Sequence, residues 1–337
     1  MNCQLAVVIP AYKDKFLDKA LTSLKNQTDK NFNVYIGDDN SPNELRSICE
    51  QYMPFLNITY TKFPNNIGAK KLVEQWERCI ALSKGEKWIW LFSDDDVADP
   101  NCVESFFSTI EKDNSRFDVY RFNTRIINDE DKITGESMES PFIDTSINMA
   151  YSILLGQRGN SMPDHIFSRH IYNKLGFVKT AYAQSADWGT SILFSSEKGI
   201  CTVSGAKVNW RLGNYNISGM AANKKVQMFK GYLQFLIWFI AFYKSCDSEQ
   251  KKGYTDNDIK EAIEINLKTL VRTHYMGVRF LSCFDLFRFY MALYGKVLFA
   301  LKRTIGLYLI FHPRFNKTIV LFKSLKNALF FNHSTYI

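Results

Sequence analysis

The sequence predicts an α/β fold: a Rossmann-like, mostly parallel, doubly wound sheet followed by a helical, basic amphipathic extension. Within residues 1–92, short apolar segments alternate four times with segments of helical periodicity. That alternation is typical of a parallel sheet with helices on both faces. From about residue 223 the strand signals end and long helical patterns follow. We therefore expect one α/β domain over residues 1–222 and a helical region over residues 223–337.

Four strands are expected where short apolar runs end in turn signals. The first run, Leu-Ala-Val-Val-Ile, ends at Pro10, and the fourth has Trp-Ile-Trp-Leu-Phe as its core. We expect strands at 5–9, 33–37, 58–63 and 87–92, with helices between them at 14–26, 44–52 and 69–82. Such sheets bind ligands at the carboxyl ends of their strands. The residues that follow Ile9 and the turns at Asp38 and Asp94 should therefore converge in space.

The rest of the chain has a mixed pattern and then a helical one. Residues 119–127 and 202–210 are expected to be strands, and residues 166–175 and 188–196 helices. In the C-terminal region we expect three helices, at 226–243, 256–276 and 285–309.

Composition excludes several classes of protein. The chain has 337 residues, of which 46% are apolar and 23% charged, so it is neither disordered nor collagen-like. Its seven cysteines include no C-x-x-C pair, which favours reduced thiols in a cytoplasmic protein. The first residues lack the basic start of a signal peptide, and no run of 18 uncharged apolar residues occurs. We therefore expect neither a secretion signal nor a transmembrane helix.

Charge is distributed unevenly along the chain. Residues 1–222 hold 24 basic and 27 acidic residues, a net −3, whereas residues 223–337 hold 18 and 7, a net +11. The eight basic residues after Asp285 alternate with aromatic and aliphatic ones, which favours a helix lying on an anionic membrane surface. The other interpretation is an amphipathic helix packed on its own domain. We do not expect nucleic acid as a partner, because the region with catalytic-looking motifs is net acidic.

Three adjacent carboxylates, Asp94, Asp95 and Asp96, follow the fourth apolar run. Like charges this close raise each other's pKa unless a cation lies between them. Mg²⁺ or Mn²⁺ takes one or two protein carboxylates and completes its shell with phosphate oxygens and water. The alternative, a cap for a helix beginning near Pro100, needs only Asp99. The pattern therefore favours a site for a metal ion and a diphosphate.

Six short motifs occur in an ordered series along the chain. They are VVIPAYK (7–13), SLKNQT (23–28), VYIGDDNS (34–41), NNIG (65–68), WLFSDDDVADP (90–100) and SADW (185–188). In this order they resemble glycosyltransferase family 2, whose members have the GT-A fold, over about residues 4–215. The resemblance implies an inverting enzyme of the type that builds bacterial surface polysaccharides. Such an enzyme moves a sugar from a nucleotide sugar to an acceptor hydroxyl.

The resemblance also implies a donor site. Asp38 or Asp39 would bind the uracil or ribose of a UDP-hexose or UDP-N-acetylhexosamine, opposite a wall formed by residues 10–12. The implied donor-binding residues are Pro10, Ala11, Tyr12, Asp38, Asp39, Asn66, Gly68, Lys70, Asp94 and Arg211. The family's arginine after the Asn-x-Gly loop is absent at its usual offset, and Lys70, Lys71 or Arg78 would replace it.

By the same resemblance, Asp95 and Asp96 would hold Mn²⁺ or Mg²⁺. The first acid of the family's DXD motif is Ser93 here, so the assignment among the three following aspartates stays open. Asp187 would be the general base that takes the proton of the acceptor hydroxyl, and it can also cap the helix that follows.

The acceptor is expected to be a lipid-linked glycan. The polar segment 156–169 would face it, with Asn160, Asp164 and His165 able to bind sugar hydroxyls, although a structural hydrogen bond is the other interpretation of His165. Together with the basic C-terminal region, this predicts a cytoplasmic protein held peripherally at the inner face of the cell membrane, in capsule, O-antigen or exopolysaccharide synthesis.

Two other functions fit parts of the pattern. A sugar nucleotidyltransferase shares the sheet and the metal carboxylates, but it usually has a Gly-rich phosphate loop after the first strand, and PAYKDKF (10–16) has no glycine. A non-catalytic carbohydrate-binding protein with a GT-A-like fold would not need to retain Asp39, Asp95 and Asp187.

Overall fold

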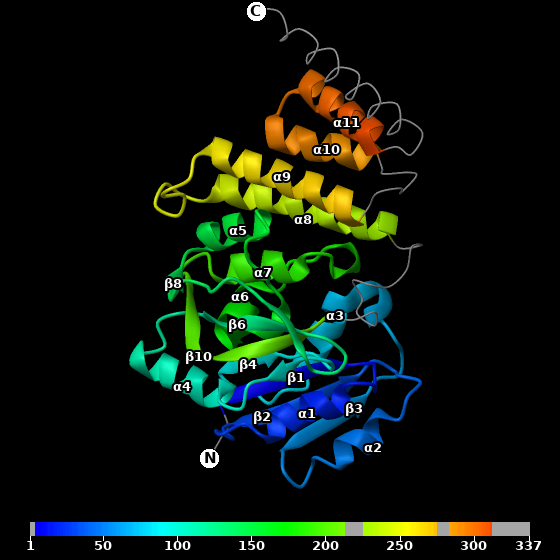
Figure 1. Ribbon diagram of the computed structural model, residues 1–337, viewed down its shortest axis with the longest axis vertical. Helices are drawn as coiled ribbons and strands as arrows, with labels where there is room; N and C mark the ends of the chain where they lie inside the picture. The colour runs from blue at the N-terminus through cyan, green and yellow to red at the C-terminus, as the bar shows by residue number, and fades with distance from the viewer. Residues whose placement is uncertain (1–3, 213–224, 275–282, 312–337) are drawn as a thin grey trace, which may run out of the picture. The chain divides into compact units, whose positions relative to one another are not determined.

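The computed structural model describes residues 4–212, 225–274 and 283–311. It confirms the expected α/β fold, with a central sheet and a helical C-terminal region (Figure 1). The described residues fall into two compact units. The first contains residues 4–212 and 246–253, and the second contains residues 225–245, 254–274 and 283–311.

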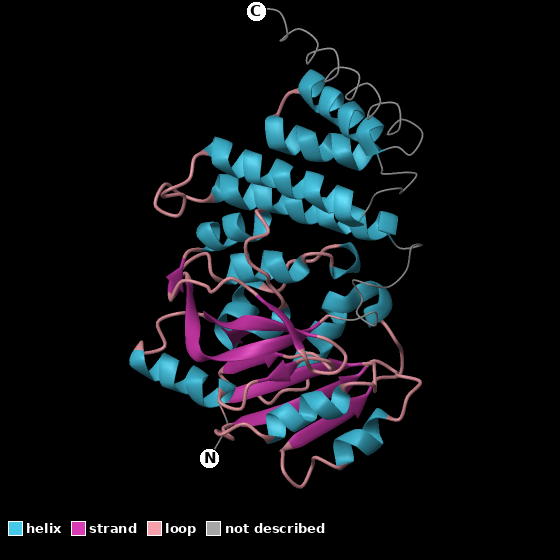
Figure 2. Ribbon diagram, viewed as in Figure 1, coloured by secondary structure: helices cyan, strands magenta, loops and turns pink. Residues whose placement is uncertain are grey.

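In the described part of the first unit, ten strands form one mixed sheet (Figure 2). The strand order is β3-β2-β1-β4-β9-β6-β10-β5, with β7 beside β6 and β8 beside β10. The strands are β1 (Leu5–Ala11), β2 (Phe32–Asp38), β3 (Ile58–Lys62), β4 (Trp88–Leu91), β5 (Val97–Ala98), β6 (Val119–Ile127), β7 (Ile133–Glu136), β8 (Ile143–Asp144), β9 (His165–Ser168) and β10 (Ile200–Arg211).

The first half of the sheet is parallel and covered on both faces. Strand β1 pairs in parallel with β2 and β4, and β2 pairs in parallel with β3. One face of β1 packs with α1 (Leu17–Lys25) and α2 (Leu45–Glu50) in a continuous apolar core. Helix α3 (Gly68–Ile80) contacts β1, β2 and β4, and its Cys79 lies against Gly37 on the opposite face. This arrangement brings the carboxyl ends of β1, β2 and β4 to one edge.

The second half of the sheet departs from the parallel pattern. Strand β9 runs antiparallel between β4 and β6. The prediction of a helix over residues 166–175 is therefore wrong for residues 166–168. Ile166 and Phe167 are buried and pair with strands on both sides, so sheet pairing outweighs their helical spacing. The helix, α6 (Arg169–Leu175), begins where this pairing ends.

The other helices of the first unit frame the second half of the sheet. They are α4 (Cys102–Lys112), α5 (Ser146–Leu154) and α7 (Ala186–Phe194), with 3-10 turns at Met162–Asp164 and Ala181–Ala183. Helix α4 contacts β10, and α5 contacts α7. Sequence periodicity did not predict α5, because its residues are apolar on most sides and buried.

The second unit is helical in its described residues. It comprises α8 (Lys225–Ser245), α9 (Asp256–His274), α10 (Cys283–Tyr294) and α11 (Val297–Phe311). The prediction of one helix over 285–309 is wrong, because Gly295 has φ +66, a left-handed conformation that ends a helix. Residues 275 and 276 of another expected helix lie outside the described residues. Within the described ranges, no helix has the length and apolar character needed to cross a membrane.

A buried carboxylate joins three helices of the second unit. Glu264 of α9 lies 2.8 Å from Lys268 and 3.5 Å from Arg303 of α11, and the hydroxyl of Tyr294 of α10 donates to it. These contacts lower the pKa of Glu264 against the opposing effect of burial. The charge is therefore compensated, as a buried carboxylate requires.

We predict that Gly37→Ala destabilises the protein by about 1–3 kcal/mol, because it overpacks the interface between β2 and α3. A Cβ at Gly37 would overlap Sγ of Cys79 and lie 2.9 Å from Cε2 of Phe63. The matched control is Gly135→Ala on β7, whose Cβ would meet Ile126 at an ordinary 3.5 Å. Urea denaturation measures both, and equal stability of the two variants would contradict the packing described here.

Candidate active site

Hydrogen bonds show that the turns after β1, β2 and β4 meet at one edge of the sheet. The backbone N–H groups of Tyr12 and Lys13 both donate to Oδ2 of Asp94 at 2.9 Å. Ser41 Oγ donates to the carbonyl of Tyr12 at 2.7 Å, and Asp39 N–H donates to the carbonyl of Ala11 at 2.9 Å. The predicted convergence of these distant segments is confirmed.

The two aspartates after β2 have different surroundings. Asp38 is fully buried, accepts from the backbone N–H of Ser41 at 2.7 Å and accepts from the hydroxyl of Tyr60. Asp39 accepts from the N–H groups of Ile67 and Gly68, each at 2.8 Å. Asp38 therefore closes its own turn, whereas Asp39 ties the β2 turn to the start of α3.

Arg78 is the basic residue that reaches Asp39. Its guanidinium donates to Oδ1 of Asp39 and, at 3.0 Å, to the carbonyl of Asn65. Lys71 instead pairs with Glu74 on the surface at 3.0 Å, and Lys70 is exposed. Of the three candidates that the sequence left open, Arg78 is the one that lies at this turn.

The three carboxylates after β4 are buried together. Asp95 lies 2.6 Å from Nζ of Lys13, and the hydroxyl of Ser93 donates to it. Burial raises the pKa of Asp94, against the lowering effect of Lys13. Burial and the neighbouring Asp95 raise the pKa of Asp96 well above its usual range. Burial alone would lower the pKa of Lys13, but the carboxylates around it raise it overall.

Arg211 supports this turn from within the protein. Its N–H donates to Asp96 Oδ1 at 2.8 Å, and its Nε donates to the carbonyl of Asp95 at 2.8 Å. Its guanidinium also lies 2.6 Å from Asp131 and packs on Phe16. The side chain is 1% exposed. A role for Arg211 in diphosphate binding stays a prediction, and it would require the guanidinium to give up one of these contacts.

A hard divalent cation at the carboxylate turn stays a prediction. The described residues contain no cluster of three or more acidic, His or Cys side chains arranged as a complete metal shell. Mg²⁺ and Mn²⁺ do not need one, because phosphate and water complete their coordination. The ammonium group of Lys13 already holds a positive charge against Asp95. Asp95, with Asp96 beside it, would hold the cation.

A second acidic pair lies farther along the chain. Asp164 is buried and accepts from the hydroxyl and the N–H of Ser161 at 2.7 and 2.8 Å. Burial raises the pKa of Asp164 to about 7, and burial together with the charge of Asp164 raises the pKa of Asp187 to about 7. The Asp164 charge also raises the pKa of Asp96. Asp164 therefore lies within electrostatic reach of both the carboxylate turn and Asp187.

The backbone before Asp187 is strained. Tyr182, Ala183 and Ser185 have φ values of 57, 53 and 57, in the left-handed region that non-glycine residues rarely adopt. Each such residue costs of order 1–3 kcal/mol, and such strain concentrates at functional sites. The Ser185 bend starts α7, so that Asp187 lies in its first turn, where the helix dipole favours the ionised carboxylate.

The remaining donor-site residues are placed as follows. Pro10 is partly buried, and the side chain of Ala11 is buried in the core, so that Ala11 offers its backbone to the site. Tyr12 is 43% exposed at the same edge, and Asn66 is exposed in the loop before α3. Gly68 has no room for a side chain, because a Cβ there would lie 2.6 Å from Asp39 Oδ2.

Sequence reasoning missed Lys13. Its position inside the first motif was noted, but the side chain had no assigned role, and periodicity gives no sign that it turns toward Asp95. A signal was present, since three clustered carboxylates require a nearby cation in the absence of a metal.

A parallel sheet extended by antiparallel strands, with an acidic turn at its edge, is the GT-A arrangement. The solved structures of S. aureus TarS 1-349 with UDP-GlcNAc and with UDP match it with TM-scores of 0.67 and 0.63, at 16% and 14% identity, covering 90% of this chain and 89% of theirs. The mannosyltransferase PcManGT of Pyrobaculum calidifontis, with GDP-Man and Mn²⁺, matches with a TM-score of 0.51 at 11% identity, covering 90% of this chain and 84% of that one.

The sequence places the chain within a family. The model for glycosyl transferase family 2 matches residues 6–177, more than half of the 337 residues, and the chain belongs to this family. An uncharacterized glycosyltransferase of Haemophilus influenzae is 28% identical over 186 residues, which cover 55% of this chain and 59% of the relative. A processive diacylglycerol beta-glycosyltransferase of Mycoplasma pneumoniae is 27% identical over 128 residues, which cover 37% of this chain and 36% of the relative. The match thus spans about three fifths of the first relative and about one third of the second.

We predict that Lys13→Met tightens Mn²⁺ binding in the absence of donor by roughly 5–10-fold, because it removes an ion pair of about 1 kcal/mol from Asp95. Electron paramagnetic resonance of free Mn²⁺ measures the affinity. The matched control is Lys15→Met, which removes a pair with Asp129 at 2.7 Å. Weaker binding by Lys13→Met than by the control would show that Lys13 does not compete with the cation.

Proposed function

We propose that the protein transfers a sugar from a nucleotide sugar to a hydroxyl of a glycan acceptor, with inversion at the anomeric carbon. The main support is that Asp39, Asp94 and Asp95 meet the backbone after β1 at the carboxyl edge of the sheet. Family membership and the structural neighbours that hold UDP-GlcNAc or GDP-Man support a nucleotide-sugar donor. We assign UDP-hexose or UDP-N-acetylhexosamine as the donor.

The donor is held from two sides in this proposal. Asp39, fixed by the N–H of Gly68 and by Arg78, faces the nucleoside with Asp38 behind it, against Pro10, Ala11 and Tyr12. Asn66 and Lys70 are exposed beside this turn and extend the donor site from the start of α3. Both belong to the segment that Asp39 ties down.

The diphosphate lies over the carboxylate turn. Asp95 and Asp96 would hold Mn²⁺ or Mg²⁺, which would supply positive charge to the departing diphosphate. Asp94 keeps Tyr12 and Lys13 in place through their backbone N–H groups. The Lys13 ammonium, 28% exposed, is free to turn from Asp95 toward a phosphate oxygen once the carboxylate charge is otherwise compensated. Arg211 would add a second donor from the same turn.

Asp187 is the proposed general base. An acceptor hydroxyl loses its proton as it attacks the anomeric carbon, and a carboxylate within hydrogen-bond reach takes that proton. A pKa of about 7 suits this task, because the group is then basic enough to accept a proton and a substantial fraction of it is ionised at neutral pH. Burial is the main cause of this raised pKa, and the charge of Asp164 adds to it.

The two alternative functions, a sugar nucleotidyltransferase and a non-catalytic carbohydrate-binding protein, are less well supported. The segment after β1 has no glycine-rich phosphate loop, in contrast to the usual sugar nucleotidyltransferase. A non-catalytic carbohydrate-binding protein has no need for a carboxylate with a raised pKa behind a strained turn.

We predict that the full-length protein releases UDP from a UDP-sugar in a metal-dependent reaction. A thermal-shift screen of nucleotide sugars with Mn²⁺ identifies the donor to use. Asp95→Ala is expected to lose about 100-fold or more in rate and to lose Mn²⁺-dependent stabilisation, because it removes the main metal ligand. Asp187→Asn is expected to keep donor binding and lose transfer. In the wild type the transfer rate should rise with pH through about 7, as the base loses its proton.

Two results would contradict this assignment. Normal sugar transfer by Asp187→Asn would remove Asp187 from the reaction. Formation of a nucleotide sugar and pyrophosphate from a sugar 1-phosphate and a nucleoside triphosphate, with no nucleotide released from nucleotide sugars, would instead favour the nucleotidyltransferase.

We further propose that the helical unit binds an anionic membrane surface at the cytoplasmic face and there meets a lipid-linked acceptor used in surface-polysaccharide synthesis. Leu298, Leu301 and Ile305 of α11 are 83%, 47% and 50% exposed, beside Lys302 and Arg303. A cavity of about 250 Å³ between α8 and α10 is lined by three apolar and four polar residues: Leu233, Ile237 and Trp238, with Lys230, Gln234, Asp285 and Arg288. Apolar surface with basic residues suits a hydrocarbon chain with an anionic head group.

We predict that the double variant Leu298→Glu and Leu301→Glu loses at least about 10-fold in affinity for vesicles containing phosphatidylserine, because it replaces inserted apolar side chains with anions. Sedimentation with vesicles measures binding. The control is Ile133→Glu, an equally exposed residue on β7 of the other unit. Unchanged sedimentation of the double variant would refute membrane attachment through α11.

A further inference from the structure

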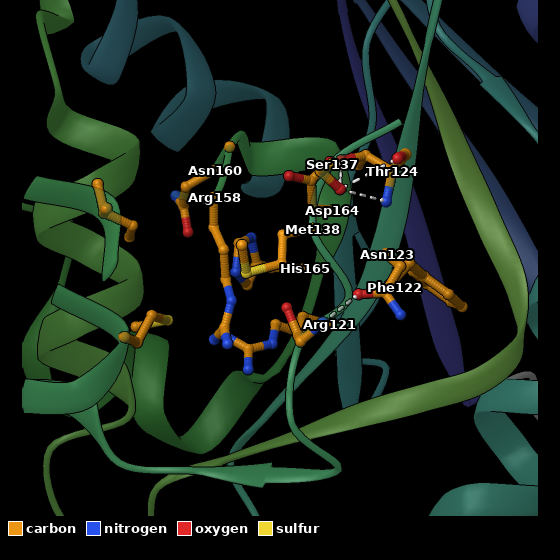
Figure 3. A pocket seen from close by; sticks show the side chains of 14 residues that line it. Arg121, Phe122, Asn123, Thr124, Ser137, Met138, Arg158, Asn160, Asp164 and His165 are labelled. Atoms are coloured by element: carbon orange, nitrogen blue, oxygen red, sulfur yellow. Dashed lines mark hydrogen bonds between the residues drawn. The ribbon is translucent and has the colours of Figure 1, made fainter. Parts of the chain in front are cut away.

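A small pocket beside β6 and β9 has no role in the donor site. Its lining includes Arg121, Asn123, Arg158, Asn160, Asp164 and His165 (Figure 3). The cavity volume is about 10 Å³, close to the space that one water molecule needs. The pocket therefore admits one small polar group.

His165 offers a hydrogen-bond acceptor to this pocket. Its Nδ1 lies 2.8 Å from the carbonyl oxygen of Ser161, which can only accept, so Nδ1 carries the proton. Burial, with a further contribution from Arg121, lowers the pKa of His165 to about 4, so the ring is neutral at pH 7. Nε2 is then a bare acceptor. It is buried and has no hydrogen-bond partner among the described residues.

Arg158 offers a donor to the same pocket. One guanidinium nitrogen lies 3.1 Å from Asp144, which also pairs with Arg121 at 2.8 Å. The Arg158 Nε–H is buried and, within the part of the chain that the structure describes, unpartnered. A buried polar group left unpaired costs roughly 1–3 kcal/mol. Two such groups lining one cavity indicate that something fills it.

The chemistry of these two groups selects the occupant. It must donate a hydrogen bond to Nε2 of His165 and accept one from Nε–H of Arg158. A hydroxyl group or a water molecule does both, whereas a carboxylate or a fully ionised phosphate cannot donate and an ammonium cannot accept. We propose that the pocket recognises one hydroxyl group of the acceptor sugar, and that a water molecule fills it otherwise. The proposal rests on the transferase function proposed above.

The position of the pocket fits an acceptor subsite. His165 faces Arg121 in the β9–β6 pairing, and Nε1 of Trp90 on β4 donates to the carbonyl of Pro163 at 2.7 Å. These contacts hold residues 163–165 at the edge of the sheet that carries the carboxylate turn. Asp164 lines the pocket and acts electrostatically on Asp187.

Asp187 itself is not among the lining residues. In this proposal the hydroxyl bound in the pocket is not the one that reacts, and its role is to select the acceptor. A site built to hydrogen-bond a hydroxyl strongly rejects an analogue that lacks it, because its polar groups are then left unpaired.

The test uses the full-length protein with ¹⁵N-labelled histidine, and His165→Gln assigns the signal. We expect His165 to stay neutral and protonated on Nδ1 down to about pH 5, and glycerol or methyl glycosides to shift its Nε2 resonance saturably. Acetate should cause no such shift. The shift should disappear in Arg158→Lys, which keeps the charge beside Asp144 but lacks the Nε–H donor.

Three results would overturn the proposal. The first is a His165 that titrates near its ordinary pKa, and the second is a proton on Nε2. The third is an Nε2 signal that neither glycerol nor a methyl glycoside shifts, in which case the pocket holds a water molecule only. If Arg158→Lys fails to fold, the contrast between polyols and acetate in the wild-type protein decides. Polyol-induced shifts without any UDP-sugar turnover would support hydroxyl binding in the pocket and refute the donor proposal. Turnover without polyol-induced shifts would support the donor proposal and refute hydroxyl binding in the pocket.

Discussion

Mutual repulsion among buried carboxylates at one edge of the sheet is the constraint on which the candidate site depends. The parallel β1, β2 and β4 end together, and each of the last two strands is followed by acids. These acids are all less than 8% exposed: Asp38, Asp39, Asp94, Asp95 and Asp96. Buried charges of one sign persist only where donors or cations compensate them. The surrounding structure supplies both.

The two kinds of compensation separate the aspartates into two groups. Asp38 accepts from a backbone N–H of its own turn, and Asp39 and Asp94 accept from backbone N–H groups of neighbouring segments, so these contacts fix the geometry of the edge. Asp95 instead faces the ammonium group of Lys13, and Asp96 accepts a single N–H from Arg211. The first group shapes the site, and the second is the one that we propose as the source of metal ligands.

The fold was predictable from sequence wherever a residue pattern was compatible with only one type of secondary structure. The alternation of apolar runs and helical periods up to Leu91 placed β1 to β4, because each strand there pairs with its neighbours in a simple parallel order. Beyond it, Ile166 and Phe167 had a helical spacing but pair with two strands at once. Only the tertiary structure decides such a case.

The site was predictable in part for a related reason. Motif order pointed to the aspartates, since they follow strand ends that the topology brings together. Motif order did not reveal which basic side chains would contact these aspartates. Arg78 lies on α3 and Lys13 after β1, and both are far from their acidic partners in sequence. Long flexible side chains can point in many directions, so spacing alone carries no information about their partners.

The ion pair between Lys13 and Asp95 also bears on whether folding requires a metal ion. An acidic edge that needed a metal to be electrically tolerable would tie folding to metal supply. Here the ammonium group of Lys13 compensates the charge of Asp95, so charge balance at this residue does not depend on a bound metal. If the proposed metal-dependent reaction holds, loss of the ion would stop catalysis while the domain stays folded.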